Sequence, residues 1–295
     1  MADAIADAIA DAVIQQANQH SRRLRELLHA PDILIMPGAY DTLSALFFEH
    51  LGFPAIQGSS GGIAAVYGLR DGEILLRSVA VEVYRRMVEV VTTPVNADGE
   101  KGYGGPEETA ETVRQLAAAG AAGMNLEDSD YHTPGEPIRL IPVEMQLEKL
   151  RSVMETKRRL GSEFFLNARV DAYLTRGDPA AMLDEAIRRG NAYAESGADC
   201  IFYIGVRETE TIQTLVREVH APLSILANPS TPSVRELEDL GVARVSYGVA
   251  FTRAALTGVK QLAEVLLAKG DPAPFLNQIM SGPEMNQFLR ERFWA

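Results

Sequence analysis

The feature of this sequence that most constrains its fold is an eightfold alternation of short apolar runs with longer amphipathic segments. The short runs are rich in Val, Ile and Phe, as buried strands are, and they lie at residues 33–36, 55–57, 94–97, 123–126, 164–168, 200–204, 223–227 and 242–246. The amphipathic segments have helical apolar spacing, and they lie at residues 42–51, 76–91, 106–119, 143–160, 180–196, 208–219, 233–240 and 250–269. Strands that alternate with helices pair in parallel through right-handed crossovers. The sequence therefore predicts an α/β protein built on a parallel sheet.

The number of strand–helix units distinguishes between two kinds of parallel sheet. Eight units in about 240 residues match the size of a closed barrel. The alternative, an open doubly wound sheet, usually has roughly five or six strands. We therefore predict a (β/α)8 TIM-type barrel over residues 30–270, with a helical extension at 1–29 and a helical appendage at 271–295.

The two ends of the chain differ in pattern from the barrel. Residues 2–13 repeat Ala-Asp-Ala-Ile with a period of four, with Val in place of Ile in the third copy, so Ile5, Ile9 and Val13 share one helical stripe. We expect this extension to pack on the barrel or to fray, and the alternative is a contact between subunits. Three prolines follow residue 271, which is typical of a separate segment after the last barrel helix.

Composition excludes several classes of function. The formal net charge of −12 argues against nonspecific nucleic-acid binding. No apolar run approaches the ~20 residues that span a bilayer, and the N-terminus lacks a secretory pattern. Cys200, the single cysteine, lies in an apolar strand, which predicts a buried structural thiol and no intrachain disulfide. We expect a cytoplasmic protein that binds neither nucleic acid nor membrane, and that attracts an anionic small molecule through a metal or an arginine.

Acidic residues follow consecutive strands, where barrel enzymes carry their sites. Asp98 and Glu100 are two residues apart at the end of the third strand, so both can face one side. With Asp71 and Glu127, four carboxylates would converge, and such a cluster needs a cation to offset its repulsion. Oxygen ligands favour Mg²⁺, or Mn²⁺, over Zn²⁺. The alternative is that these are ordinary loop acids among the 40 acidic residues of the chain.

Other strand ends supply candidate ligands for a substrate. Ser59, Ser60 and Gly61 lie in a Gly/Ser segment whose backbone N–H groups could bind an oxyanion, and the alternative is a flexible turn. Arg169 could grip a carboxylate with two parallel hydrogen bonds, and the alternative is a salt bridge to Asp171. The remaining candidates follow the first and seventh strands, and they are Tyr40 as a catalytic residue and Asn228 as a substrate ligand.

One long loop could cover this end of the barrel. Residues 129–142 are rich in Pro and Gly, which is compatible with a lid over the site. His132 lies in this loop, and we interpret it as a solvent-exposed histidine rather than a ligand.

Five segments together resemble one enzyme superfamily. The most specific is Pro94-Val95-Asn96-Ala97-Asp98-Gly99-Glu100-Lys101-Gly102-Tyr103-Gly104. The supporting segments are Gly68-Leu69-Arg70-Asp71, Leu126-Glu127-Asp128, Ala168-Arg169-Val170-Asp171-Ala172 and Leu226-Ala227-Asn228. Over residues 33–267 the chain resembles the isocitrate lyase / phosphoenolpyruvate mutase superfamily, whose Asp-x-Asp-x-Gly-Tyr-Gly metal motif has Glu100 in place of its second Asp here.

The resemblance implies a Mg²⁺-dependent lyase that cleaves a C–C bond of a small 2-oxo or 2-hydroxy (di)carboxylic acid through a metal-stabilised enolate. Asp98 would hold Mg²⁺ directly or through water, and Asp71, Glu100 and Glu127 would contact the metal or its water ligands. Ser59, Ser60 and Gly61 would bind the oxo-acid end of the substrate and Arg169 its carboxylate. We predict Asp71, Glu127, Arg169 and Tyr40 as the catalytic residues.

The chain also departs from known members of that superfamily. The lyases for isocitrate and methylisocitrate carry a Lys-Lys/Arg-Cys-Gly-His loop, whereas residues 128–135 here contain no cysteine, so the subfamily and the general acid/base are not assigned. Two alternatives therefore stay open, namely C–P bond chemistry on a phosphonopyruvate-like acid, by a mutase or a hydrolase, and a non-catalytic barrel that binds a keto acid. Members commonly exchange C-terminal helices between subunits, which implies a homo-oligomer, tetramer or dimer, assembled through residues 271–295.

Overall fold

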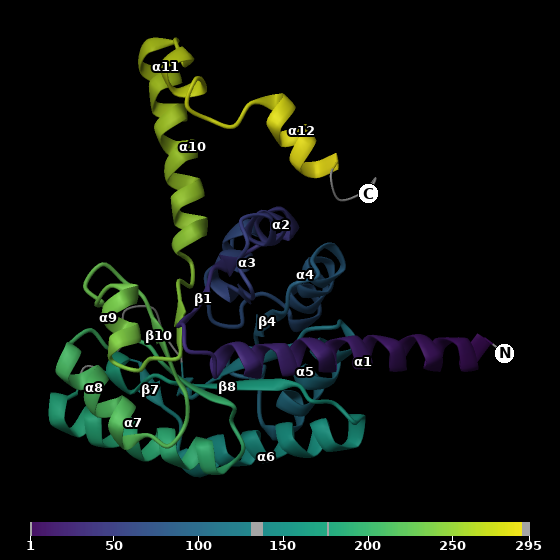
Figure 1. The fold of residues 1–295 in the computed structure, drawn as a ribbon, viewed down its shortest axis with the longest axis vertical. Helices are drawn as coiled ribbons and strands as arrows, with labels where there is room; N and C mark the ends of the chain where they lie inside the picture. The colour runs from purple at the N-terminus through teal and green to yellow at the C-terminus, as the bar shows by residue number, and fades with distance from the viewer. Residues whose placement is uncertain (1, 131–137, 176, 291–295) are drawn as a thin grey trace. The chain divides into compact units, whose positions relative to one another are not determined.

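A computed structural model of the chain describes residues 2–130, 138–175 and 177–290, without the side chains of residues 2–10, 269, 274 and 290 (Figure 1). The chain divides into two compact units, Met1–Phe251 and Thr252–Ala295. In the part of the chain that the structure describes, no helix combines the length and the hydropathy needed to cross a membrane. His132 and residues 131–137 of the predicted lid lie outside the described residues.

The larger unit is built on nine parallel strands that occupy eight positions around a barrel. In spatial order they are β1 (Leu34–Met36), β11 (Arg244–Ser246), β10 (Leu223–Leu226), β9 (Cys200–Tyr203), β8 (Phe165–Val170), β5 (Gly123–Glu127), β4 (Val95–Asp98), β3 (Ile56–Gly58) and β2 (Gly38–Ala39). Pro37 separates β1 from β2, because proline has no N–H to donate to a ladder. Its carbonyl still accepts a hydrogen bond from Gln57 N at 3.0 Å, so the two short strands act as one. The TIM-type barrel is thereby confirmed.

A helix follows each strand position, as predicted. These helices are α2 (Thr42–His50), α4 (Arg77–Val90), α5 (Pro106–Ala118), α6 (Val143–Leu160), α7 (Pro179–Glu195), α8 (Thr209–Glu218), α9 (Val234–Asp239) and α10 (Ala250–Lys269). Most of α10 belongs to the smaller unit, together with α11 (Ala273–Leu276) and α12 (Gly282–Arg290). Our boundary at residue 270 and the exchange of the appendage stay predictions.

Three short elements at the carboxyl ends of the strands were not predicted. They are α3 (Ser60–Val66), the 3-10 helix η1 (Ala172–Leu174) and the hairpin of β6 (Ser129–Asp130) and β7 (Arg139–Leu140). The Gly/Ser segment is therefore the start of a helix rather than a loop. Ser59 caps that helix by accepting a hydrogen bond from Gly62 N at 3.2 Å, which is the usual role of serine at this position.

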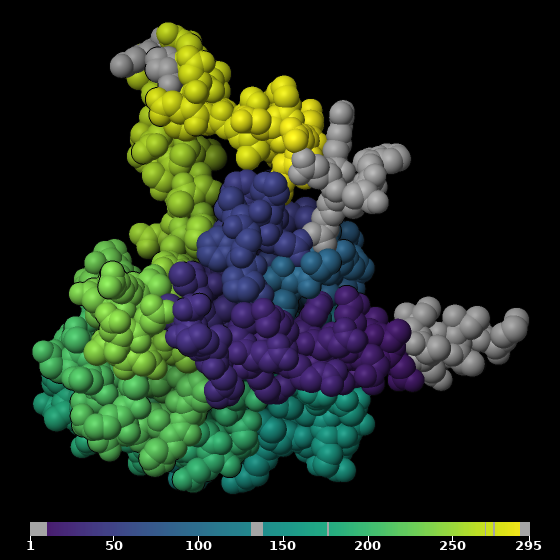
Figure 2. All heavy atoms as spheres, viewed as in Figure 1, coloured from purple at the N-terminus to yellow at the C-terminus, as the bar shows by residue number. Residues whose placement is uncertain are grey.

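The N-terminal helix α1 (Ala2–Leu28) covers the amino ends of the barrel strands. Leu24 and Leu28 are buried in one cluster with Leu34, Phe165 and other residues from the strand starts. Ser21 Oγ also donates a hydrogen bond to Ala122 O at 2.7 Å. In Figure 2 the purple residues of α1 lie directly on the teal part of the chain. The expectation that the extension packs on the barrel is confirmed for the C-terminal half of α1.

Truncation of Leu24 should measure how much this contact stabilises the barrel. Leu24 is 1% exposed, so we expect Leu24→Ala to lower the free energy of unfolding by about 2–5 kcal/mol, from lost burial and the cavity left behind. Denaturant unfolding at fixed protein concentration measures the change. Arg23→Ala is the matched control on the exposed face of the same helix, and an equal loss in both variants would contradict the packing.

The cysteine prediction is also confirmed. Cys200 is fully buried in the cluster beneath α1. Burial raises the pKa of its thiol to about 12, so the thiolate needed for reactivity is not formed at neutral pH. Cys200 is therefore a packing residue at the amino ends of the barrel strands.

Candidate active site

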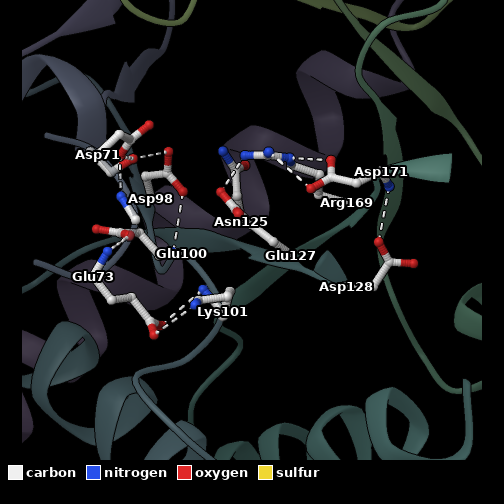
Figure 3. A network of polar contacts seen from close by, with 12 residues as sticks. Asp71, Glu73, Asp98, Glu100, Lys101, Asn125, Glu127, Asp128, Arg169 and Asp171 are labelled. Carbon is white, nitrogen blue, oxygen red and sulfur yellow. Dashed lines mark hydrogen bonds and ion pairs between the residues drawn. The ribbon is translucent and has the colours of Figure 1, made fainter. Parts of the chain in front are cut away.

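Two carboxylates, one from a strand end and one from a loop, meet at the carboxyl ends of β3 and β4 (Figure 3). Asp98 is the last residue of β4, and Asp71 lies in the loop after α3. The hydroxyl of Ser60 lies 2.9 Å from Asp98 Oδ2 and 3.1 Å from Asp71 Oδ1. Ser60 therefore bridges two of the predicted metal ligands, and a hydroxyl can donate to only one of them at a time.

The electrostatics of this pair favour a cation. Burial raises the pKa of Asp98, and the negative charge of Asp71 raises it further, although Arg169 opposes both effects. Burial and the neighbouring acids Asp98, Asp71 and Glu73 raise the pKa of Glu100 to about 8. Acids that repel one another in this way are stabilised in their charged form by a bound cation.

The loops that carry these acids are locked together by Glu73. Its carboxylate oxygen Oε1 accepts hydrogen bonds from Lys101 N at 3.1 Å and from Tyr103 N at 2.6 Å. Its own N–H donates to the carboxylate of Glu100. Glu73, Glu100 and Tyr103 adopt φ angles of 63°, 46° and 61°, a left-handed conformation that costs free energy in residues other than glycine. The reciprocal hydrogen bonds hold this strained arrangement and keep Asp71 beside Asp98.

The backbone of Asp98 is held from the helix layer by Tyr84 on α4. The Tyr84 hydroxyl accepts a hydrogen bond from Asp98 N at 3.1 Å and lies 3.3 Å from Asp98 O. The ring packs against Gly58, and a Cβ atom at that position would overlap it. Glycine at the end of β3 therefore admits the tyrosine that positions Asp98.

Removal of the Tyr84 hydroxyl should weaken this support. We expect Tyr84→Phe to lower the free energy of unfolding by about 1–3 kcal/mol, because it leaves the partly buried N–H of Asp98 without its side-chain partner. If the site binds a metal as predicted, we also expect the change to weaken Mn²⁺ binding roughly tenfold, as loss of a supporting contact does in known metal sites. Urea unfolding and isothermal titration measure the two effects. Tyr67→Phe, at a residue that is 51% exposed, is the control, and equal behaviour of both variants would contradict the role of Tyr84.

Glu127 and Arg169 form a second group beside the first. The ladder register places Glu127 of β5 opposite Arg169 of β8, whereas Asp98 lies opposite Asn125. Arg169 accordingly forms an ion pair with Glu127 and a two-point contact with Asp171, with Nε–Oδ1 at 2.6 Å and Nη2–Oδ2 at 3.0 Å. Burial raises the pKa of Glu127, and Arg169 counters that rise.

The four acids predicted to converge on one cation, Asp71, Asp98, Glu100 and Glu127, lie at the same barrel end but have different partners. Asp71 and Asp98 share Ser60, Glu100 accepts from Glu73, and Glu127 pairs with Arg169. The salt bridge between Arg169 and Asp171, weighed as the alternative for Arg169, is present. The role of Arg169 towards a substrate stays a prediction.

The remaining candidates occupy the rim of the same barrel end. A Cβ atom on Gly61 would lie 2.8 Å from Asp71 Oδ2, so glycine lets the start of α3 approach that carboxylate. Tyr40 N donates to Ser44 Oγ, and Asn228 N donates to Thr231 Oγ1, each at 3.0 Å. These are local turn contacts, and the functional roles of Tyr40 and Asn228 stay predictions.

The acidic side chains supply few ligands for a metal. Among residues 2–130, 138–175 and 177–290, no three His, Cys, Asp or Glu side chains are arranged to hold a metal ion. Mg²⁺, however, is usually bound through one or two carboxylates, with water and substrate oxygens completing its coordination. Asp71 and Asp98, joined through Ser60, fit that requirement.

Fold and site together define an α/β-barrel protein with an acidic site at the carboxyl ends of its strands, where barrel enzymes bind their substrates. The family model described as phosphoenolpyruvate phosphomutase matches residues 24–267. The chain belongs to the phosphoenolpyruvate mutase / isocitrate lyase superfamily.

Similar proteins act on small carboxylic acids, as their names state. A 2-methylisocitrate lyase of Bacillus subtilis is 30% identical over 274 residues, which cover 89% of this chain and 87% of that protein. A 2,3-dimethylmalate lyase of Eubacterium barkeri is 28% identical over 277 residues, which cover 90% of this chain and 93% of that protein. Oxaloacetate acetylhydrolase, solved with 3,3-difluorooxalacetate, superposes with a TM-score of 0.81 at 26% identity, covering 93% of this chain and 94% of that one.

Proposed function

We propose that this protein is a Mg²⁺-dependent lyase that cleaves a C–C bond of a small 2-oxo or 2-hydroxy (di)carboxylic acid. The observation that carries the proposal is the pair Asp71 and Asp98, held 3.1 Å and 2.9 Å from the hydroxyl of Ser60 at the carboxyl ends of β3 and β4. Relatives named as 2-methylisocitrate lyase and 2,3-dimethylmalate lyase support it.

Seven of the candidate residues have a stated task in this proposal. Asp98 and Asp71 would hold Mg²⁺, or Mn²⁺ in its place, which when bound supplies a Lewis acid for a substrate oxygen. Ser59, Ser60 and Gly61 would orient the oxo-acid end. The substrate carboxylate would displace Glu127 from Arg169. Glu127, whose pKa burial raises, would then be able to exchange a proton with the substrate.

A second candidate function is C–P bond chemistry on a phosphonopyruvate-like acid, by a mutase or a hydrolase. The match to a phosphoenolpyruvate phosphomutase model over residues 24–267 favours it. The third reading, a barrel that binds a keto acid without turnover, rests on the absence of a cysteine from residues 128–135.

A substrate panel separates the three functions. The protein would be incubated with Mg²⁺ and, separately, oxaloacetate, 2-methylisocitrate, 2,3-dimethylmalate or phosphonopyruvate, with detection of pyruvate, propionate, oxalate, phosphoenolpyruvate and phosphate. Cleavage of a C–C substrate supports the lyase, and conversion of phosphonopyruvate alone supports the second function. Binding of a keto acid without any product would refute both catalytic functions.

We further propose that the protein is a cytoplasmic homo-oligomer, either a tetramer or a dimer. Leu256, Val259 and Leu267 on α10 are 67%, 64% and 89% exposed in the single chain. Apolar side chains gathered on one exposed helix mark a contact with another molecule. Light scattering gives the mass in solution, and a mass equal to one chain would contradict the oligomer.

A further inference from the structure

Asp128 is a buried carboxylate that contacts Asp171, the partner of Arg169. Asp128 follows β5 directly and is fully buried. Its carboxylate accepts three hydrogen bonds, from Asp171 N at 2.9 Å, Arg189 Nη1 at 3.0 Å and Tyr193 OH at 2.8 Å. Arg189 and Tyr193 lie on α7, so Asp128 joins this helix to the ends of two strands.

Asp128 and Arg189 also hold Ile141, at the end of the β6–β7 hairpin that joins the barrel, which we call the foot of the hairpin. Ile141 follows β7, and its N–H donates to the backbone carbonyl of Asp128 at 2.9 Å. Its carbonyl accepts from Arg189 Nη2 at 2.8 Å. The backbone groups of Ile141 are therefore tied to both members of one buried ion pair.

A continuous set of contacts leads from this ion pair to the candidate active site (Figure 3). Asp128 fixes the backbone N–H of Asp171, and the carboxylate of Asp171 grips Arg169 at two points. Arg169 in turn pairs with Glu127. Any shift of Asp128 would therefore move the guanidinium that we assign to the substrate carboxylate.

Asp128 and Arg189 form an ion pair in the protein interior. Their side chains are 0% and 5% exposed. A buried ion pair is often no more stabilising than apolar residues of the same volume, while loss of one partner leaves an uncompensated charge. We therefore expect this ion pair to fix the positions of neighbouring groups rather than to increase the stability of the fold.

We propose that Asp128, Arg189 and Tyr193 form a positioning brace that holds Arg169 and the foot of the β6–β7 hairpin in one fixed arrangement. All three residues are buried, so we assign them a positioning role rather than a contact with the substrate. Their kinetic effect rests on the proposed function, whereas their effect on the backbone does not.

Hydrogen exchange of the native protein tests the brace directly. Arg189→Met removes the contacts to Asp128 and Ile141, and amide exchange at Ile141 and Asp171 should become roughly 10- to 100-fold faster, as expected for loss of hydrogen bonds to a charged group. Arg189→Lys keeps the charge and should restore part of the protection. Arg188→Met is the matched control, since Arg188 shares the partner Glu185 with Arg189 but is 53% exposed.

A kinetic readout separates positioning from general stability. If a substrate is found, Arg189→Met should raise its KM more than it lowers kcat, because Arg169 is assigned to substrate binding. If no substrate is found, the exchange data still decide the brace. Tyr193→Phe, which deletes one hydroxyl, replaces Arg189→Met if that variant does not fold. Equal acceleration across the whole barrel, or unchanged exchange at Asp171, would overturn the proposal.

Discussion

Asp98→Asn should lower kcat/KM for any accepted acid by about 10³-fold or more. A bound divalent cation contributes several kcal/mol of charge stabilisation, and each 1.36 kcal/mol corresponds to about a tenfold change in rate. Asparagine has the shape of aspartate, so the backbone contacts of Asp98 with Tyr84 would remain. The loss should therefore come from the missing charge rather than from unfolding.

Metal binding gives a second measure of this variant that does not depend on the substrate. Titration with Mn²⁺ should show affinity reduced at least about tenfold, since one of two carboxylate ligands has lost its charge. Asp184→Asn, at an exposed position on α7, is the control. Unchanged Mn²⁺ affinity together with full activity of Asp98→Asn would refute the assignment of the metal site.

Arg169→Met should strongly lower the free energy of unfolding. Glu127 and Asp171 are 4% and 0% exposed, and both lose their counter-charge. Breaking a buried ion pair by removing one partner costs about 3–5 kcal/mol of unfolding free energy. Urea unfolding measures this cost, and the double variant Arg169→Met with Glu127→Gln should recover part of it, because one of the two unpaired charges is then absent.

The loss in Arg169→Met should depend on pH. Arg169 lowers the pKa of Glu127, so its removal lets burial raise that pKa further. A carboxyl whose folded-state pKa is raised stabilises the fold when protonated and loses that contribution as the pH rises through the folded-state pKa. The deficit should therefore be smaller in mildly acidic solution than in alkaline solution. A deficit independent of pH would show that packing, not charge, is responsible.

The barrel was predictable because its signals are local. The spacing of apolar residues within each segment indicates whether it is a strand or a helix. Once the strand boundaries are known, the residues at the strand ends are known as well. The places of Asp98 and Glu127 at strand ends could therefore be predicted from the chain alone. The prediction missed the helix at Ser60–Val66, because Gly61 and Gly62 resemble a loop until the cap at Ser59 is seen.

Sequence by itself determined that this chain forms a (β/α)8 barrel of the phosphoenolpyruvate mutase / isocitrate lyase superfamily with acids at one end. Tertiary structure alone decided which acids meet. Register placed Glu127 opposite Arg169, and left-handed turns at Glu73 and Glu100 brought Asp71 to Asp98. The tertiary fold also places Asp128 beside Arg189, which is 61 residues away in the sequence. Periodicity specifies which way a side chain faces, whereas its partner depends on strand register and loop conformation, to which distant parts of the chain contribute.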